Sequence, residues 1–183
     1  MINADFLKTF RRATEELWRR TPINPDIYGF QFPPGTRWNR GLSAETILEY
    51  ENALGVQFPH DFKLFLGEMN GTDLATLNIS GSSGLPQRES VGVYSYARNI
   101  EIVKARIDHL RPSRAEITRD FAGQGFDLSQ EVNLVPISSH RCLACTSDLN
   151  SSVVLSIVVE DTDAIVYGNS LKEHLEREFL ERS

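Results

Sequence analysis

Two cysteines that are separated by two residues, Cys142 and Cys145, form the pattern with the most obvious chemical potential in this sequence. A pair with this spacing can exchange thiols and disulfides or supply half of a zinc site. The pair lies within a β-prone run, however, and side chains three positions apart in a strand point to opposite faces. No second Cys-x-x-Cys or His-x-x-x-His pair is present to complete a zinc site. We therefore predict two buried free thiols and no metal site.

Histidine and serine could support nucleophilic catalysis if the right groups met. The four histidines have no metal-ligand spacing, and they are His60, His109, His140 and His174. We expect exposed or edge positions for His60 and His174, which fall on predicted helices. Ser138 and Ser139 directly precede His140, a combination that could suggest a serine hydrolase. The Gly-x-Ser-x-Gly pattern of a hydrolase is absent, and no third acid can be assigned. We predict no catalytic residues.

Three carboxylates gather in a short polar turn between two β-prone runs, at Glu160, Asp161 and Asp163. The cluster lacks the regularly spaced oxygen ligands of an EF-hand calcium loop. A solvated turn is the default interpretation. A contact with an arginine-rich partner is the functional alternative, because complementary charge steers an encounter and fixes its orientation. The loop-like run at residues 80–90 lacks the Gly-x-x-x-x-Gly-Lys-Ser/Thr pattern of a phosphate-binding loop, so we predict no cofactor.

The charge of the chain is unevenly distributed. Residues 1–41 contain seven Lys/Arg and four Asp/Glu, whereas residues 42–183 contain twelve and twenty-one, so the net charges are +3 and −9. An acidic body argues against direct binding of nucleic acid, because attraction to phosphates dominates that kind of affinity. It favours a basic partner, or simply solubility. No apolar run approaches the roughly 20 residues that span a bilayer, and the N-terminus has no secretory signal, so we expect a cytoplasmic protein.

Residues 1–41 look like an extension of the main domain. The pattern at residues 4–20 predicts an amphipathic helix with arginines on its polar side. Its apolar stripe consists of Phe6, Phe10, Ala13 and Leu17, with Leu7 and Trp18 beside it. Such a basic helix can lie on a membrane surface, but we favour packing of its stripe onto the domain. Residues 21–41 are rich in proline, glycine and aromatic residues, which predicts an extended segment laid over the domain. We expect its aromatics to be at least partly buried: Tyr28, Phe30, Phe32 and Trp38.

Residues 42–72 have the clearest local pattern, that of two short helices and a tight joint. Ser43 can cap the first helix, and Gly55 suits a left-handed helix end. Pro59 suits the first position of the second helix, which stops at the turn dipeptide Asn70-Gly71. Apolar residues recur on one face of each helix: Ile47, Tyr50 and Leu54 on the first, with Leu48 at the edge, and Phe62, Phe65, Leu66 and Met69 on the second.

This stretch resembles the signature of the SMI1/KNR4 family, the founding group of the SUKH superfamily. The pattern is LG-V-x-(L/F)-P-x-D-(F/Y)-x-x-F-L-x-x-x-N-G, and it is carried by Leu54, Gly55, Val56, Phe58, Pro59, Asp61, Phe62, Phe65, Leu66, Asn70 and Gly71. Glu51 falls where the family usually has an acidic residue. We assign structural roles to Glu51, Gly55, Pro59 and Gly71, since the joint needs them whatever the protein binds.

The rest of the chain predicts an α+β fold, a mainly antiparallel sheet flanked by helices. Short strands are expected at residues 74–79 and 91–94, and a meander at residues 133–137, 141–146, 152–159 and 164–167. The third strand of the meander is apolar on both faces and should be central. Helices are expected at residues 100–110, after Ser113 and after Ser170; both serines precede a glutamate at capping-box spacing. Residues 133–180 resemble the C-terminal half of the family less specifically, and we divide the chain into an extension, residues 1–41, and an SMI1/KNR4-like domain, residues 42–183.

The resemblance implies a non-catalytic binding protein. Bacterial members of the superfamily resemble immunity proteins, each of which binds a cognate toxin domain, often a nuclease or deaminase, and blocks it. An acidic inhibitor suits a basic toxin. The interface that we predict consists of acidic and polar residues near the loops: Glu68, Asn70, Asp73, Glu160, Asp161 and Asp163. The alternative is a general protein-interaction or regulatory module of the SMI1/KNR4 type, and a toxin gene directly upstream would favour immunity over it.

Overall fold

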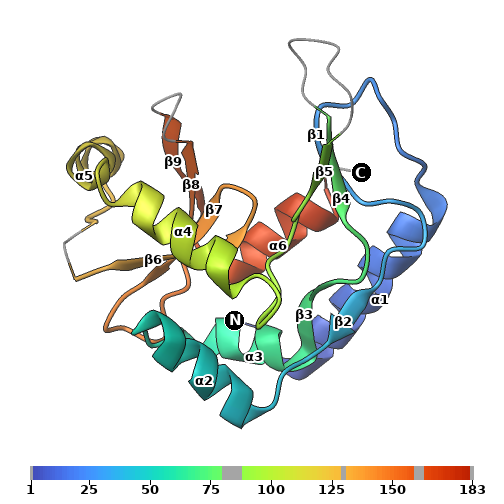
Figure 1. Cartoon of the computed structure of the whole chain (residues 1–183), viewed down its shortest axis with the longest axis horizontal. Helices are drawn as coiled ribbons and strands as arrows, with labels where there is room; N and C mark the ends of the chain where they lie inside the picture. Colours follow the sequence, from blue (N-terminus) through green and yellow to red (C-terminus); the bar gives the residue numbers. More distant parts are fainter. Residues whose placement is uncertain (1, 80–87, 129–130, 159–162, 182–183) are drawn as a thin grey trace.

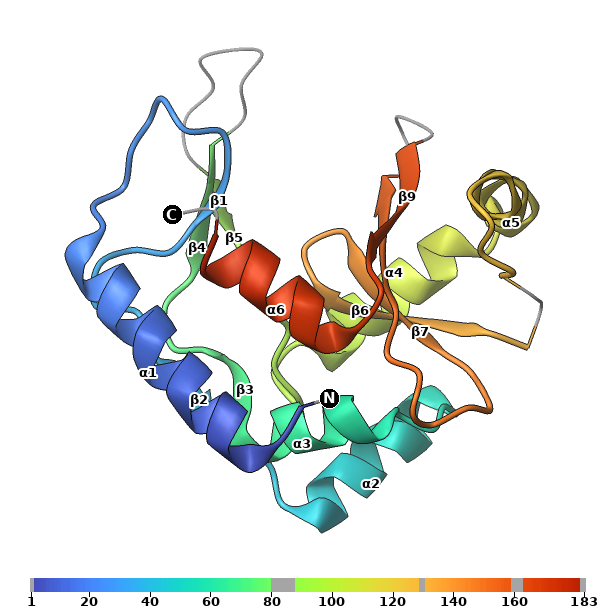
Figure 2. The same cartoon turned by 180° about the vertical axis from the view of Figure 1, so that it is seen from behind.

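A computed structural model describes residues 2–79, 88–128, 131–158 and 163–181 (Figures 1 and 2). The helices are α1 (Ala4–Arg20), α2 (Ala44–Leu54), α3 (His60–Glu68), α4 (Ile100–Leu110), α5 (Arg114–Gly123) and α6 (Leu171–Phe179). The strands are β1 (Gly29–Gln31), β2 (Trp38–Arg40), β3 (Met69–Thr72), β4 (Thr76–Ile79), β5 (Arg88–Ser90), β6 (Asn133–Ser138), β7 (Arg141–Cys145), β8 (Val154–Val158) and β9 (Asp163–Gly168). The α+β fold is therefore confirmed.

The largest sheet is the antiparallel meander β6-β7-β8-β9, in which β7 and β8 are the inner strands. The expectation of a central third strand is thus confirmed. Two smaller antiparallel sheets tie the first 41 residues to the rest: β1 pairs with β4, which pairs with β5, and β2 pairs with β3. The predicted strand at residues 91–94 is wrong, because the pairing with β4 ends at Ser90. Most of the loop-like run at residues 80–90 lies outside the described residues.

The meander separates two apolar clusters. Successive side chains of a strand point to opposite faces, and β7 shows this directly. Leu143 and Cys145 join the first cluster with α1, α2, α3 and α6, whereas Cys142 and Ala144 join the second with α5 and the end of α4. Figure 2 shows α6 running in front of the sheet, with α4 and α5 beyond it. The signature joint and the N-terminal helix therefore belong to the same packed core.

The N-terminal helix has the predicted bounds but buries a different stripe. Its buried residues are Leu7, Phe10, Thr14 and Trp18, whereas the predicted Phe6 and Leu17 are half-buried and Ala13 is exposed. The large indole of Trp18 stacks on Phe32 with ring centroids 4.4 Å apart. Thr14 can be buried because its hydroxyl donates to the carbonyl of Phe10 at 2.9 Å and accepts from the Trp38 indole at 2.8 Å.

The extended segment at residues 21–41 follows the sequence prediction with one exception. Phe30 and Phe32 are half-buried and Trp38 is buried, as expected, but the side chain of Tyr28 is 68% exposed. Tyr28 directly precedes β1, the edge strand of the three-stranded sheet, whose partner β4 ends at Ile79 opposite Gly29. The register of this short pairing leaves Tyr28 beyond the last strand partner among the described residues.

Candidate partner-binding surfaces

The signature joint is held by a buried carboxylate. Glu51 of α2 is 7% exposed, and its Oε1 accepts a hydrogen bond from the backbone N–H of Phe58 at 2.6 Å. The same oxygen lies 2.8 Å from the ammonium of Lys63 on α3. One side chain thus ties the end of α2 to the linker and to the next helix. The structural role that we assigned to Glu51 is confirmed.

The helix cap Ser43 and three further signature positions also serve the backbone. Ser43 accepts from the N–H of Thr46 at 3.2 Å, and Gly55 ends α2 in the left-handed conformation with φ +66°. Gly71 has φ +70°, and a Cβ there would lie 2.7 Å from the Cβ of Ser95. Pro59 is the N-cap of α3, not the first helical residue that we predicted, because the helix begins at His60. The carbonyl of Pro59 accepts from the N–H of Phe62.

The first group of predicted contact residues lies at the end of α3 and along β3. Asn70 is 7% exposed, and its amide bonds both backbone groups of Tyr96: Oδ1 accepts from the N–H at 2.9 Å, and Nδ2 donates to the carbonyl. The Glu68 carboxylate lies 3.7 Å from Arg11 of α1. Asp73 is exposed, and its Oδ1 caps the N–H groups of Arg37 and Leu74. The turn that we predicted at Asn70-Gly71 is wrong, because α3 ends at Glu68 and Met69–Thr72 form β3. The side chain of Asn70 instead holds the backbone of Tyr96, which is a structural role.

Of the second group of predicted contact residues, the structure describes the position of Asp163. Glu160 and Asp161 fall outside the described residues, and Asp163 begins β9, opposite Val158 in the register with β8. Both views place β3 beside β2 and α1, and place β9 at the far side of the fold near α5 (Figures 1 and 2). The fold therefore does not bring Asp163 together with Glu68, Asn70 and Asp73.

The two cysteines face opposite clusters, as the strand geometry predicted. Both are free and buried, and burial raises the pKa of each thiol to about 12, because a thiolate would lose its hydration there. A thiol with a raised pKa is a poor nucleophile and a poor metal ligand at neutral pH. Among the residues that the structure describes, no group of three or more His, Cys, Asp or Glu side chains is placed to hold a metal ion.

One histidine prediction is wrong. His60 is exposed, but His174 is 1% exposed, buried on α6 with its ring 5.7 Å from that of Tyr167 and 6.0 Å from that of Phe179. Its position one turn from the start of α6 places it on the helix face that also buries Leu171 and Leu175. Ser139 Oγ lies 3.0 Å from His140 Nδ1, a contact between adjacent residues of the β6–β7 turn.

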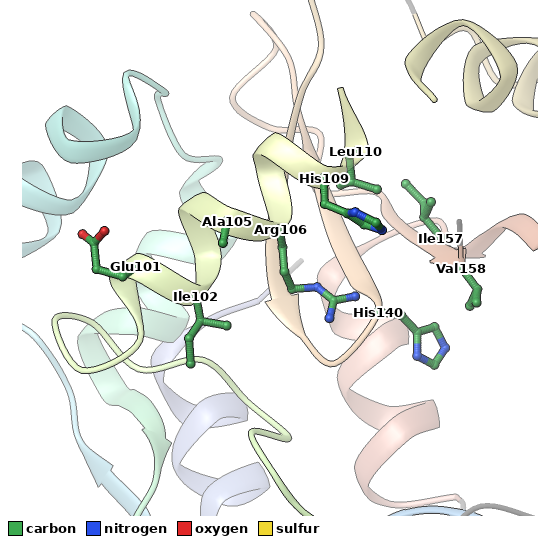
Figure 3. A pocket seen from close by; sticks show the side chains of 9 residues that line it. All are labelled: Glu101, Ile102, Ala105, Arg106, His109, Leu110, His140, Ile157 and Val158. Carbon is green, nitrogen blue, oxygen red and sulfur yellow. The ribbon is translucent and has the colours of Figure 1, made fainter. Parts of the chain in front are cut away.

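A groove that the sequence did not single out lies between α4 and the outer end of β8 (Figure 3). It has a volume of about 590 Å³ and is lined by Glu101, Ile102, Ala105, Arg106, His109, Leu110, His140, Ile157 and Val158. Its α4 side presents an arginine and a histidine three positions apart beside apolar residues. That spacing was a usable signal, but the strand and turn that complete the groove come 34 to 52 positions later in the chain.

The model of the SMI1 / KNR4 family (SUKH-1) matches residues 41–177. No curated protein matches the chain, and no solved structure matches it either. Of the helices that the structure describes, none has the length and apolar character needed to cross a membrane.

Proposed function

Because the chain belongs to the SMI1/KNR4 family (SUKH-1), we propose that it is a bacterial immunity protein that binds a cognate toxin domain and neutralises it. The family match, which extends over residues 41–177, is the observation that carries the proposal. Inhibition occurs by stoichiometric occlusion, in which the bound protein covers the active site of a nuclease or deaminase. The protein itself performs no catalysis and needs no cofactor for this task.

The charge of the domain supports a basic partner. Residues 42–183 have a net charge of −9. A nuclease must attract phosphates and is therefore usually basic at its cleft, so an acidic protein is a natural competitor for that surface. Opposite charges accelerate association and align the two proteins before close contacts form.

Within the predicted interface, the exposed carboxylates are the stronger candidates for contact with a toxin. Asp73 is exposed on the loop after β3, and we keep Glu160, Asp161 and Asp163 as a second acidic contact. Glu68 is paired with Arg11, so a partner would have to compete with an existing ion pair. Asn70 is committed to Tyr96, and its replacement is expected to disturb the fold before it disturbs binding.

The test is co-expression with the C-terminal domain encoded directly upstream. A stable complex, together with rescue of cells from the toxicity of that domain, is the expected result. The charge-reversal variant E160K/D161K/D163K should then bind more weakly. The matched control is E49K/E116K/E131K, which reverses three exposed carboxylates elsewhere on the molecule. If the neighbouring domain is toxic and the protein neither binds nor neutralises it, the immunity proposal is wrong.

The same experiment addresses the alternative of a regulatory interaction module. A neighbour that is not toxic but still forms a stable complex would favour that module, because binding without neutralisation is what it predicts. The family match is compatible with both kinds of function, so the toxicity assay is the measurement that separates them.

A further inference from the structure

The groove between α4 and β8 combines apolar side chains with a cation. Ile102 is 44% exposed on α4, and Ala105 follows on the same side of the helix. Leu110 and Ile157 belong to the second apolar cluster and close the inner end of the groove. Apolar area that is exposed next to a hollow gains free energy when a partner covers it, at roughly 25 cal/mol per Å².

Arg106 is the cation at the centre of this groove. It is half-buried, and its guanidinium lies beside the hydroxyl of Tyr94. Burial raises the pKa of Tyr94, and the nearby positive charge of Arg106 partly offsets that rise. The Tyr94 hydroxyl in turn donates to the carbonyl of Ser139 at 3.0 Å. The buried tyrosine therefore helps to hold the guanidinium in position. A guanidinium has five N–H donors, so this contact leaves donors for a ligand.

Two other arginines, the half-buried Arg11 and the buried Arg141, differ from Arg106 in their ion pairs. Arg11 is paired with Glu15 and Glu68, and Arg141 is paired with Glu178. Among the described residues, no carboxylate lies within 4 Å of the Arg106 guanidinium. Glu101, the acid on the groove wall, is paired with Lys104 at 3.1 Å.

The arrangement of these side chains favours an anion next to an apolar group. Figure 3 shows Arg106 extending from α4 toward His140, with Glu101 at the opposite end and turned away. His109 lies one helical turn further along α4, on the Ile157 side. A carboxylate fits a partly desolvated guanidinium better than a neutral group does, because the charge-assisted hydrogen bonds are shorter and stronger.

We propose that this groove binds a segment of a protein partner in which an apolar side chain is adjacent to a carboxylate. The carboxylate lies on Arg106, and the apolar side chain covers Ile102, Ala105 and Ile157. A protein segment fits better than a free metabolite because much of the wall is exposed, including Glu101, Ile102 and Ala105. Small-molecule pockets enclose most of the surface of their ligand.

The identity of the partner as a toxin rests on the proposed function, but the chemistry of the groove does not. A basic toxin domain still carries some acidic residues. The acidic surface of this protein would attract the toxin, and one carboxylate of the toxin beside an apolar side chain would then fix the orientation of the complex in the groove. The groove therefore adds a specificity contact to a broadly electrostatic association.

The first experiment uses two peptides that differ only in charge, acetyl-Leu-Glu-amide and acetyl-Leu-Gln-amide. Binding to the full chain is followed by the backbone amide signals of Ile102, Arg106 and Ile157 in NMR spectra. The glutamate peptide should shift these signals with an affinity about tenfold higher than that of the glutamine peptide, because only it forms a charged hydrogen bond. The variant Arg106→Gln should remove this difference, whereas Arg119→Gln, an exposed arginine of α5, should preserve it.

Equal affinity of the two peptides, or a charge preference that survives in Arg106→Gln, would overturn the proposal. So would shifts that lie outside the groove. Thermal unfolding of each variant shows whether it is folded, and Ile102→Ser, an exposed substitution, provides a second variant that should weaken both peptides.

The second experiment separates this inference from the proposed function. If the upstream domain binds and Arg106→Gln weakens that complex about tenfold, both are supported. If the complex forms and Arg106→Gln leaves its affinity unchanged, the groove proposal fails while immunity stands. If the neighbouring domain is toxic but neither binds nor is neutralised, while the glutamate peptide selects the groove, immunity fails while the groove proposal stands.

Discussion

The joint between α2 and α3 and the groove beside α4 each place a charged side chain among apolar residues, but they use the charge differently. Glu51 is buried with a backbone N–H and an ammonium on the same oxygen. Arg106 is half-buried beside a tyrosine hydroxyl, and the described residues offer it no carboxylate. The charge of Glu51, at a signature position, is therefore engaged in holding the fold together. Arg106, in contrast, lies outside the signature and keeps N–H donors that a partner could use.

The comparison predicts its largest effect at Glu51. Replacement by alanine leaves the buried N–H of Phe58 without its acceptor, and it removes the ion-pair partner of Lys63, whose side chain is half-buried. We expect Glu51→Ala to lower the free energy of unfolding by about 3 kcal/mol, as measured by urea denaturation. Glu51→Gln keeps an acceptor but loses the ion pair, so its loss should be smaller, about 1 kcal/mol.

Glu49 on the same helix is the matched control. It is exposed, and Glu49→Ala should change the free energy of unfolding by less than about 0.5 kcal/mol. Equal losses for the alanine variants at positions 49 and 51 would mean that the joint does not depend on the buried carboxylate.

Three glycines form a graded series that tests the backbone of the same region. Gly71→Ala combines a positive φ with a Cβ that would meet Ser95, so we expect a loss of about 2 kcal/mol. Gly55→Ala has the positive φ without the clash, and about 1 kcal/mol is expected. Gly67→Ala lies in α3 with open space around its Cβ, and a gain of about 0.5 kcal/mol is expected. Thermal or urea unfolding gives the ranking, and any other order contradicts this account of the joint.

The buried thiols predict how stability depends on alkaline pH. Their pKa is about 12 in the folded protein and about 9 in the unfolded protein. As the pH rises through about 9, the unfolded state loses these protons first, so the free energy of unfolding decreases. From about pH 8 to about pH 9.5 the two cysteines should together cost about 1.5 kcal/mol of stability. The variant C142A/C145A should be less stable overall but should lose less stability over this pH interval.

Chemical modification offers an independent check of the same burial. In the native protein at about pH 8, a thiol reagent should modify both cysteines far more slowly than in urea, because burial withholds the thiolate from solvent. Rapid modification of the folded protein would contradict the burial of Cys142 and Cys145 on opposite faces of β7.

The smallest stability effect is expected at Arg106, and it completes the comparison. Arg106→Gln removes a charge that has no carboxylate partner among the described residues, so the free energy of unfolding should change by less than about 0.5 kcal/mol. Urea unfolding measures it alongside Glu51→Gln. A loss at Arg106 as large as that at Glu51 would show that the groove cation is structural, like the carboxylate of the joint.

Local patterns predicted much of the fold because they report local geometry. Ser170 accepts from the N–H of Glu173 as its capping-box spacing indicated, and the meander has the predicted strands. The same signal failed at Ser113, which makes no side-chain cap although α5 begins after it. Ser113 follows closely on α4, and its φ of −90° and ψ of 4° differ from the extended backbone of Ser170.

Burial was harder to predict than secondary structure. His174 is buried because α6 packs its face against the first apolar cluster, a contact between segments far apart in sequence. The stripe of α1 is rotated by one position because Trp18 and Thr14 find partners in Phe32 and Trp38. Helical periodicity gives the existence of an apolar face, whereas its neighbours decide which residues occupy the centre of that face.

The sequence by itself determined the family, the two-helix joint and its structural residues, and the opposite orientation of the two cysteines. Each of these depends on spacing within a few residues, where backbone geometry fixes the outcome. Only the tertiary structure decided that Asn70 is committed to Tyr96, that Asp163 lies far from Asp73, and that α4 meets β8 to form a groove around Arg106. Those outcomes depend on contacts between distant segments, and no local pattern specifies which surfaces long-range packing brings together.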